Sequence, residues 1–127
     1  MHTESIGGGA FEHWSPEEVR DALTRHEIVL IDVRTAQEFA FERVAGALLS
    51  PMAELDPANL PTQDGKRLVL HCGSGMRSRK VAEACLAAGI TRIAHLDGGF
   101  AAWKAAGMAY LATDPTTGGV RKVPAAG

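Results

Sequence analysis

The chain has 127 residues, enough for one domain whose hydrophobic core needs neither a metal ion nor disulfides for support. Its formal charge of only −2 provides no field that would recruit nucleic acid or an acidic membrane surface. Its two cysteines, without a CxxC pair or a Cys/His cluster at metal-binding spacing, argue against a structural zinc site and a disulfide framework.

The two ends of the chain carry few structural signals. The amino-terminal stretch MHTESIGGGAFEHW has no apolar segment of the signal-peptide kind, and no apolar run approaches the length of a membrane span. We therefore expect a cytoplasmic protein with reduced thiols. Residues 1–10 and 112–127 are rich in Gly, Thr and Pro and are predicted to be loose tails on either side of a domain at 11–111.

Two capping boxes mark helix starts in the first third of the chain. In WSPEEVRDALTRH, Ser15 is followed by a proline and, three positions on, by Glu18; in TAQEFAFE, Thr35 and Glu38 repeat the spacing. Between them, IVLIDV (28–33) is a continuous apolar, β-branched run, typical of a strand that is covered on both faces. This order predicts helix, strand, helix.

The rest of the chain continues the alternation of strands and helices. GALLSPM is a weak strand signal, AELDPANLP indicates a short helix or turn, and RLVLH (67–71) and RIAHL (92–96) are predicted buried strands. A helix at about 78–88 has an apolar face, and GFAAWKAAG predicts a last helix that ends at Gly107. The apolar face consists of Val81, Ala82, Cys85, Leu86 and Ala88. Alternating strands and helices predict an α/β fold with a mostly parallel sheet.

The stretch HCGSGMRS, residues 71–78, joins a predicted strand to a predicted helix. In an open α/β sheet, ligands bind at the carboxyl ends of the strands, which is where Cys72 lies. Gly73 and Gly75 permit a curled loop whose N–H groups point inward, and the helix adds the positive end of its dipole. Arg77 adds a permanent charge and a planar fork of donors. Together these features predict a Cys72 pKa below the usual ~8.5 and a loop that holds an anion beside the thiolate.

Other polar or nucleophilic side chains lie near this edge of the predicted sheet. Cys85 falls on the apolar face of the following helix and is predicted to be inert core. His71 precedes Cys72 on its strand, and both a structural and a supporting role are open. Asp32 and Arg34 end another strand at the same edge, where a charged pair would help to order the site. For Arg34, however, we expect a local pair with Glu38 at the helix start.

Three blocks of the sequence resemble the successive signature segments of single-domain rhodaneses (sulfurtransferases): IDVRTAQEFAFERVAGALLSPM, LVLHCGSGMRSRKVAEACLAAGI and LDGGFAAWKAAGM. The resemblance spans residues 12–110, in the order and at the spacing of that family. It implies a three-layer α/β/α sandwich around a mostly parallel five-stranded sheet. It also implies that Cys72 is catalytic and forms a persulfide. In LDGGFAAW, the resemblance assigns Gly98, Gly99 and Trp103 to packing.

For a chain of this family we expect a two-step transfer of sulfur. The Cys72 thiolate attacks the outer sulfur of thiosulfate or another sulfane donor, sulfite leaves, and cyanide, a thiol or a cysteine of a partner protein takes the sulfur. Arg77 either orients the anionic donor or braces the loop, and the sequence leaves both roles open. No metal, organic cofactor, nucleic acid or membrane is expected to take part. The expected binding groups are the backbone N–H groups and hydroxyls of Gly73, Ser74, Gly75, Met76, Arg77 and Ser78.

The length of the loop separates sulfur transfer from cysteine-based phosphatase or arsenate reductase chemistry. Cysteine phosphatases place five residues between the cysteine and the arginine, so that the loop wraps a phosphate group. Here four residues separate Cys72 from Arg77, and Ser78 stands where a phosphatase has its arginine. The shorter loop makes a tighter cradle that suits the outer sulfur of a persulfide. A persulfide carrier, or a regulatory binding module of the same fold with little turnover, is the alternative to a sulfurtransferase.

Overall fold

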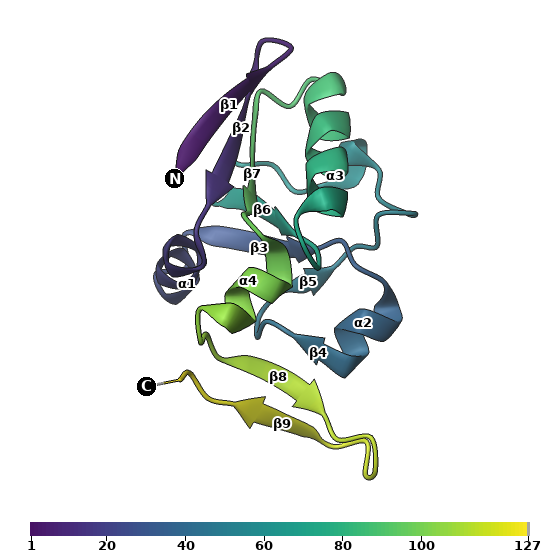
Figure 1. Ribbon diagram of the computed structural model, residues 1–127. Helices are drawn as coiled ribbons and strands as arrows, with labels where there is room; N and C mark the ends of the chain where they lie inside the picture. The colour runs from purple at the N-terminus through teal and green to yellow at the C-terminus, as the bar shows by residue number, and fades with distance from the viewer. Residues whose placement is uncertain (127) are drawn as a thin grey trace.

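A six-stranded sheet crosses the molecule in the order β1-β2-β7-β6-β3-β5 (Figure 1). The computed structural model describes residues 1–126. The strands of this sheet are β1 (His2–Ile6), β2 (Gly9–Trp14), β7 (Arg92–Leu96), β6 (Arg67–His71), β3 (Ile28–Asp32) and β5 (Leu48–Leu49). The five strands from β2 to β5 are parallel, and β1 pairs with β2 in the antiparallel direction. The expected α/β fold with a mostly parallel sheet is confirmed, with one further edge strand.

Helices cover both faces of this sheet. They are α1 (Pro16–Thr24), α2 (Ala36–Phe41), α3 (Met76–Ala87) and α4 (Gly99–Ala105), with a 3-10 turn at Pro57–Asn59. On one face, α1 and α4 bury Val19 and Phe100 against strand residues such as Leu30. On the other face, α3 buries Val81 against Phe11 and its neighbours. Within residues 1–126, no helix is long and apolar enough to cross a membrane.

The helix ends follow the local signals in the sequence. Both capping boxes form: the Ser15 hydroxyl accepts from the Glu18 N–H while the Glu18 carboxylate accepts from the Ser15 N–H, and Thr35 and Glu38 repeat this exchange. After α4, Gly107 has φ +74, the left-handed conformation expected of a residue that follows a helix end. The predicted helix at 78–88 begins earlier, at Met76, and Ala88 is an exposed cap residue rather than part of the apolar face.

The terminal segments differ from the sequence prediction. Residues 1–10, predicted to be a loose tail, form β1 and the start of β2. At the other end, β9 (Val120–Val123) pairs with β8 (Tyr110–Thr113), which pairs in turn with β4 (Glu42–Arg43) in a three-stranded antiparallel sheet. The prediction of loose tails is therefore wrong for these strands, because pairing satisfies backbone groups in a way that composition does not reveal. Residue 127 lies outside the described residues.

Candidate active site

Cys72 directly follows β6, at the carboxyl edge of the parallel strands, and its side chain is fully buried. The chain then turns sharply into α3, with Gly75 at φ +105 in the position just before the helix. This turn aims two backbone donors at the sulfur: the N–H of Gly75 lies 3.0 Å from Cys72 Sγ and the N–H of Ser78 lies 3.4 Å from it. The curled loop predicted from the two glycines is therefore present around the thiol.

Two effects compete at the Cys72 thiol. Burial raises its pKa because the thiolate would lose contact with water, but hydrogen bonds from Ser78 and from the N–H groups of Gly75 and Ser74 outweigh burial and lower the pKa overall. The predicted direction is confirmed, with Ser78 as the main donor. At Cys85, a residue of α3 whose side chain packs in the core, burial raises the pKa to about 11. Of the two thiols, Cys72 is therefore the more acidic one, as a nucleophile would need to be.

The first turn of α4 fixes the other side of the loop. The N–H of Phe100 donates to the carbonyl oxygen of Cys72 at 2.8 Å, and the N–H of Ala101 donates to that of Gly73 at 3.0 Å. This contact requires a residue without a side chain at Gly99, since a Cβ there would lie 2.6 Å from the Cys72 oxygen. Gly99 also has φ +64, which favours glycine. Its packing role is thus a contact with the active-site loop itself.

Arg77 forms a two-pronged ion pair with Glu38 of α2. Its Nη1 and Nη2 lie 2.7 and 3.0 Å from the two carboxylate oxygens, and this pairing lowers the pKa of Glu38 to about 2 and raises that of Arg77. The arginine therefore ties the loop to α2. Beside it, Arg77, Met52 and Val33 help to line a hollow of about 130 Å³.

The remaining predicted loop residues differ in their exposure. The Ser74 side chain points to solvent, and its contribution to the site comes from its backbone N–H. Met76, the first residue of α3, is also exposed, with 72% of its surface accessible. Ser78 is fully buried, and its Oγ lies 3.6 Å from Cys72 Sγ. Of the two expected hydroxyl contacts, the structure forms the one from Ser78.

Asp32, Arg34 and His71 come together on the sheet face that α4 covers, beneath Phe100. Arg34 binds the Asp32 carboxylate through Nε and Nη2, at distances of 2.8–3.1 Å, so the expected Arg34–Glu38 pair is wrong. Glu38 is engaged by Arg77 instead. His71 Nε2 lies 3.3 Å from Asp32 Oδ2, and its Nδ1 lies 3.2 Å from the carbonyl oxygen of Cys72.

This buried cluster supports the backbone of the nucleophile. Burial would raise the pKa of Asp32, but contacts with His71 and Arg34 outweigh it and hold the pKa at about 2, so the carboxylate stays charged. A charged Asp32 anchors Arg34, and His71 Nδ1 contacts the Cys72 carbonyl oxygen. The three residues thus lie directly behind the nucleophile's backbone, where a supporting role stays a prediction.

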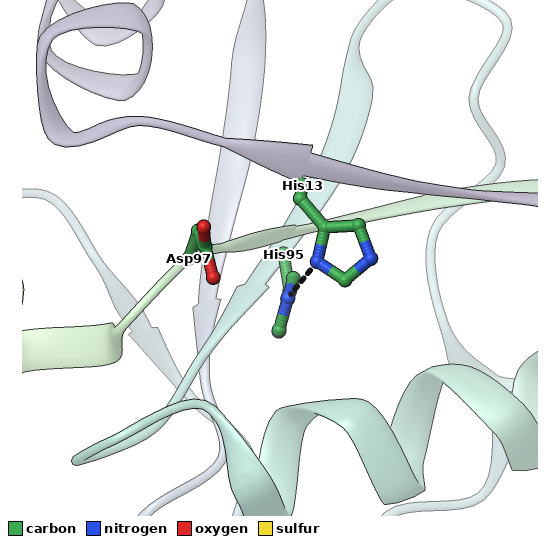
Figure 2. A group of neighbouring side chains, drawn as sticks. All are labelled: His13, His95 and Asp97. Carbon is green, nitrogen blue, oxygen red and sulfur yellow. Dashed lines mark hydrogen bonds between the residues drawn. The ribbon is translucent and has the colours of Figure 1, made fainter. Parts of the chain in front are cut away.

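A second polar group near the loop was not anticipated from the sequence. His13 on β2 and His95 on β7 are register partners on the face that α3 covers, and His95 Nδ1 lies 2.8 Å from Ser78 Oγ. Together with Asp97, their ligand atoms lie within 4.8 Å of one another (Figure 2). The sequence offers one signal, which is that His95 stands in RIAHL, a segment otherwise predicted to be a buried strand.

A model of the family described as "Rhodanese-like domain" matches residues 15–106. The chain belongs to the rhodanese-like domain family. The matched range includes the Cys72 loop, its brace at Glu38 and the α4 turn at Gly99. The resemblance inferred from the three sequence blocks is therefore confirmed.

Three relatives illustrate the range of proteins that share this rhodanese-like sequence. An uncharacterized protein of Synechocystis is 35% identical, over 78% of this chain and 55% of its own length. The probable adenylyltransferase/sulfurtransferase MoeZ of Mycobacterium tuberculosis is 37% identical, over 70% of this chain and 24% of that protein. The thiosulfate sulfurtransferase GlpE of Coxiella burnetii is 31% identical, over 69% of this chain and 82% of that protein. The chain thus spans about half of the first relative and about a quarter of the second.

Solved structures show the same rhodanese-like fold. A rhodanese-like domain protein of Staphylococcus aureus superposes with a TM-score of 0.62 at 31% identity, covering 72% of this chain and 90% of that one. A Rhodopseudomonas palustris protein, described as a possible tyrosine phosphatase, has a TM-score of 0.66 at 24% identity, covering 76% of this chain and 82% of that one. At that lower identity the likeness establishes the fold alone.

Proposed function

We propose that the protein is a sulfurtransferase that carries sulfane sulfur on Cys72. The observation that carries this proposal is the loop itself, in which backbone N–H groups and the Ser78 hydroxyl converge on a single buried sulfur and lower its pKa. Relatives that share the family and are named as sulfurtransferases support the same chemistry. Cytoplasmic, reducing surroundings would suit a free thiol of this kind.

In the first step, the Cys72 thiolate attacks the outer sulfur of thiosulfate. A new S–S bond forms on Cys72, the bond between the two thiosulfate sulfurs breaks, and sulfite leaves with the bonding electron pair. In the second step, cyanide, a small thiol or a cysteine of a partner protein attacks the outer sulfur and returns Cys72 as a thiolate. The N–H groups of the loop would hold the negatively charged outer sulfur between the two steps.

The size of the loop favours this chemistry over phosphoryl transfer. With four residues between Cys72 and Arg77, the donors of Gly75 and Ser78 already lie within 3.4 Å of one sulfur atom, so the cradle is closed around an object of that size. The Arg77 fork, which a phosphatase would use on its substrate, is committed to Glu38. Neither feature suits a tetrahedral phosphate that needs donors on three oxygens.

The test is a thiosulfate:cyanide transfer assay combined with the intact mass of protein isolated from cells. We expect turnover in the wild type and a mass increase of one sulfur atom. We expect neither in Cys72→Ser, because a hydroxyl cannot form a persulfide. Cys85→Ser serves as the matched control, which should keep most of the activity at some cost in stability, since it places a hydroxyl in the core. The added sulfur without turnover would indicate a carrier. Turnover in Cys72→Ser would overturn the proposal.

A further inference from the structure

A buried chain of hydrogen bonds connects the Cys72 thiol with the surface. Ser78 Oγ lies 3.6 Å from Cys72 Sγ and 2.8 Å from His95 Nδ1. His95 Nε2 lies 2.9 Å from His13 Nδ1, the contact drawn in Figure 2, and His13 Nε2 lies 3.1 Å from Glu4 Oε1. Glu4 reaches solvent, with 37% of its side chain exposed, whereas the other four residues are buried. The buried thiol therefore has a connected route to water.

The hydrogen-bond donors in this series of side chains can all point outward, from Cys72 toward Glu4. The thiol donates to Ser78 Oγ, the Ser78 hydroxyl to His95 Nδ1, the His95 Nε2–H to His13 Nδ1, and the His13 Nε2–H to Glu4. Each group then uses one hydrogen and one acceptor, with both imidazoles neutral. If every hydrogen moves one step outward, Cys72 becomes a thiolate and Glu4 passes one proton to water. Charge is conserved. Every link from Cys72 to His13 is again hydrogen-bonded with its donor reversed, while His13 Nε2 and the Glu4 carboxylate are left as two acceptors that water must bridge.

We propose that Ser78, His95 and His13 form a proton relay that deprotonates Cys72, and that His95 is a positioning residue acting on the thiolate through Ser78. The inference rests on the proposed role of Cys72 as the nucleophile. In the reversed state, His95 Nδ1–H donates to Ser78 Oγ, which directs the Ser78 hydroxyl hydrogen onto the thiolate. That adds a third donor to the N–H groups of Gly75 and Ser78.

The surroundings of His95 keep it neutral, as the relay requires. Burial is the main cause that lowers its pKa to about 4, and the proximity of His13 and Arg79 lowers it further, against the opposing effects of Asp97 and Glu4. The groups that face it come from every packed element: Ser78 and Arg79 from α3, His13 from β2, Glu4 from β1 and Asp97 after β7. At the outer end, hydrogen bonds from Arg79 and His13 lower the pKa of Glu4 to about 2, so its carboxylate is ionised at neutral pH.

The geometry fits a hydrogen-bonded pair of imidazoles better than a metal site. Zinc holds its nitrogen ligands at roughly 2.0–2.1 Å, which places two tetrahedral ligand atoms roughly 3.4 Å apart. The facing nitrogens of His13 and His95 are only 2.9 Å apart and share a hydrogen. Figure 2 shows Asp97 beside the pair, with no hydrogen bond to either ring. Asp97 therefore serves as the matched control. A bound cation would be coordinated by its carboxylate, whereas the relay does not use this residue.

The test follows the rate of Cys72 alkylation by iodoacetamide against pH, measured on the Cys72 peptide by mass spectrometry. We expect His95→Phe to raise the midpoint by about half a pH unit or more, because the Ser78 hydroxyl is no longer directed at the thiolate. His95→Asn should recover part of this shift, since its amide keeps a donor toward Ser78. Asp97→Asn should not raise the midpoint.

A double-mutant cycle separates the relay from a general effect of packing. In a Ser78→Ala background, His95→Phe should cause no further rise, because the link between His95 and the sulfur is already cut. An equal rise with and without Ser78 would overturn the relay, as would a rise in Asp97→Asn that matches the one in His95→Phe. His95→Asn carries the same test if His95→Phe does not fold. The readout needs no sulfur transfer, so its failure is distinct from failure of the proposed function.

Discussion

At the scale of single residues, Gly99 is as important to the site as the nucleophile's own loop. It lies where the start of α4 touches the carbonyl groups of Cys72 and Gly73, and a Cβ there would lie 2.6–2.8 Å from three backbone atoms. Backbone atoms cannot move aside as a flexible side chain does. A side chain at this position must therefore displace the loop that holds the sulfur.

We predict that Gly99→Ala reduces sulfurtransferase kcat/KM and destabilises the fold by about 1–3 kcal/mol, the usual cost of overpacking. Gly118→Ala is the matched control, because Gly118 has a similar φ of +73 but no atom within 4 Å of an added Cβ. It isolates the strain of the left-handed backbone from the clash. Urea unfolding and the thiosulfate:cyanide assay provide the two measurements. Equal losses in the two variants would show that the contact with the loop is unimportant.

The Arg77–Glu38 pair supports a second prediction at this scale. Arg77→Ala should raise both the thiosulfate KM and the pKa of Cys72, because a cation near the thiolate is lost. Arg77→Lys should restore only part of each, since an ammonium lacks the fork that grips Glu38. Glu38→Gln, which preserves the capping box, should instead lower the Cys72 pKa by leaving Arg77 uncompensated. Alkylation against pH measures all three. An unchanged profile in Arg77→Ala would assign control of the pKa to Ser78 and the loop amides alone.

At the scale of elements, the signals that the sequence carries best are local ones. Capping boxes at Ser15 and Thr35, apolar runs for β3 and β6, and the glycines of the Cys72 loop all act within a few residues, and each was predicted correctly. Partners that lie far apart in the sequence are harder to predict. The partner of Glu38 is 39 positions away in Arg77, so a local Arg34 pair was expected instead.

The histidine pair shows the same limit more clearly. His13 and His95 are 82 positions apart, and they meet because β2 and β7 pair in a register that places them side by side. No feature of either segment alone specifies that register. The strands β1 and β9 were missed for a related reason, since short polar strands become visible only once their partners are known.

The loop between β6 and α3 allows its length to be tested as the determinant of chemistry. Inserting one glycine between Met76 and Arg77 restores the five-residue spacing of cysteine phosphatases. The N–H groups would then no longer converge on one sulfur, and we expect sulfurtransferase kcat/KM to fall at least tenfold, about 1.4 kcal/mol of transition-state stabilisation. Inhibition by phosphate, arsenate or vanadate should strengthen. Circular dichroism must first show a folded variant. Undiminished transfer without any gain in oxyanion binding would contradict the role assigned to loop length.

At the scale of the whole molecule, the described chain surrounds the site with elements from both termini. The strand β1 adds Glu4 to the end of the polar chain that starts at Cys72, and the antiparallel β4-β8-β9 sheet joins the carboxyl-terminal segment to the end of α2. The amino-terminal strand, which carries little hydrophobic signal, thus completes a network that begins at the nucleophile. Glu4 at its outer end forms an ion pair with Arg79, so the stability of the fold depends on pH.

The last prediction concerns acid unfolding. His95 is 3% exposed and has a pKa of about 4 in the folded protein, below the ordinary value of 6.5 that applies when the chain unfolds. Between these two values the unfolded chain binds a proton that the folded protein does not, so stability falls as the pH decreases from 6.5 to 4, by up to about 3 kcal/mol. Urea unfolding at a series of pH values should show this decline in the wild type, and a flatter profile in His95→Asn. The carboxylates of Glu4, Asp32 and Glu38, with pKa values near 2, lose their stabilising effect mainly below this window and are the same in both proteins. Equal slopes for wild type and His95→Asn between pH 4 and 6.5 would show that His95 is not held neutral, and would remove the basis for a relay through uncharged imidazoles.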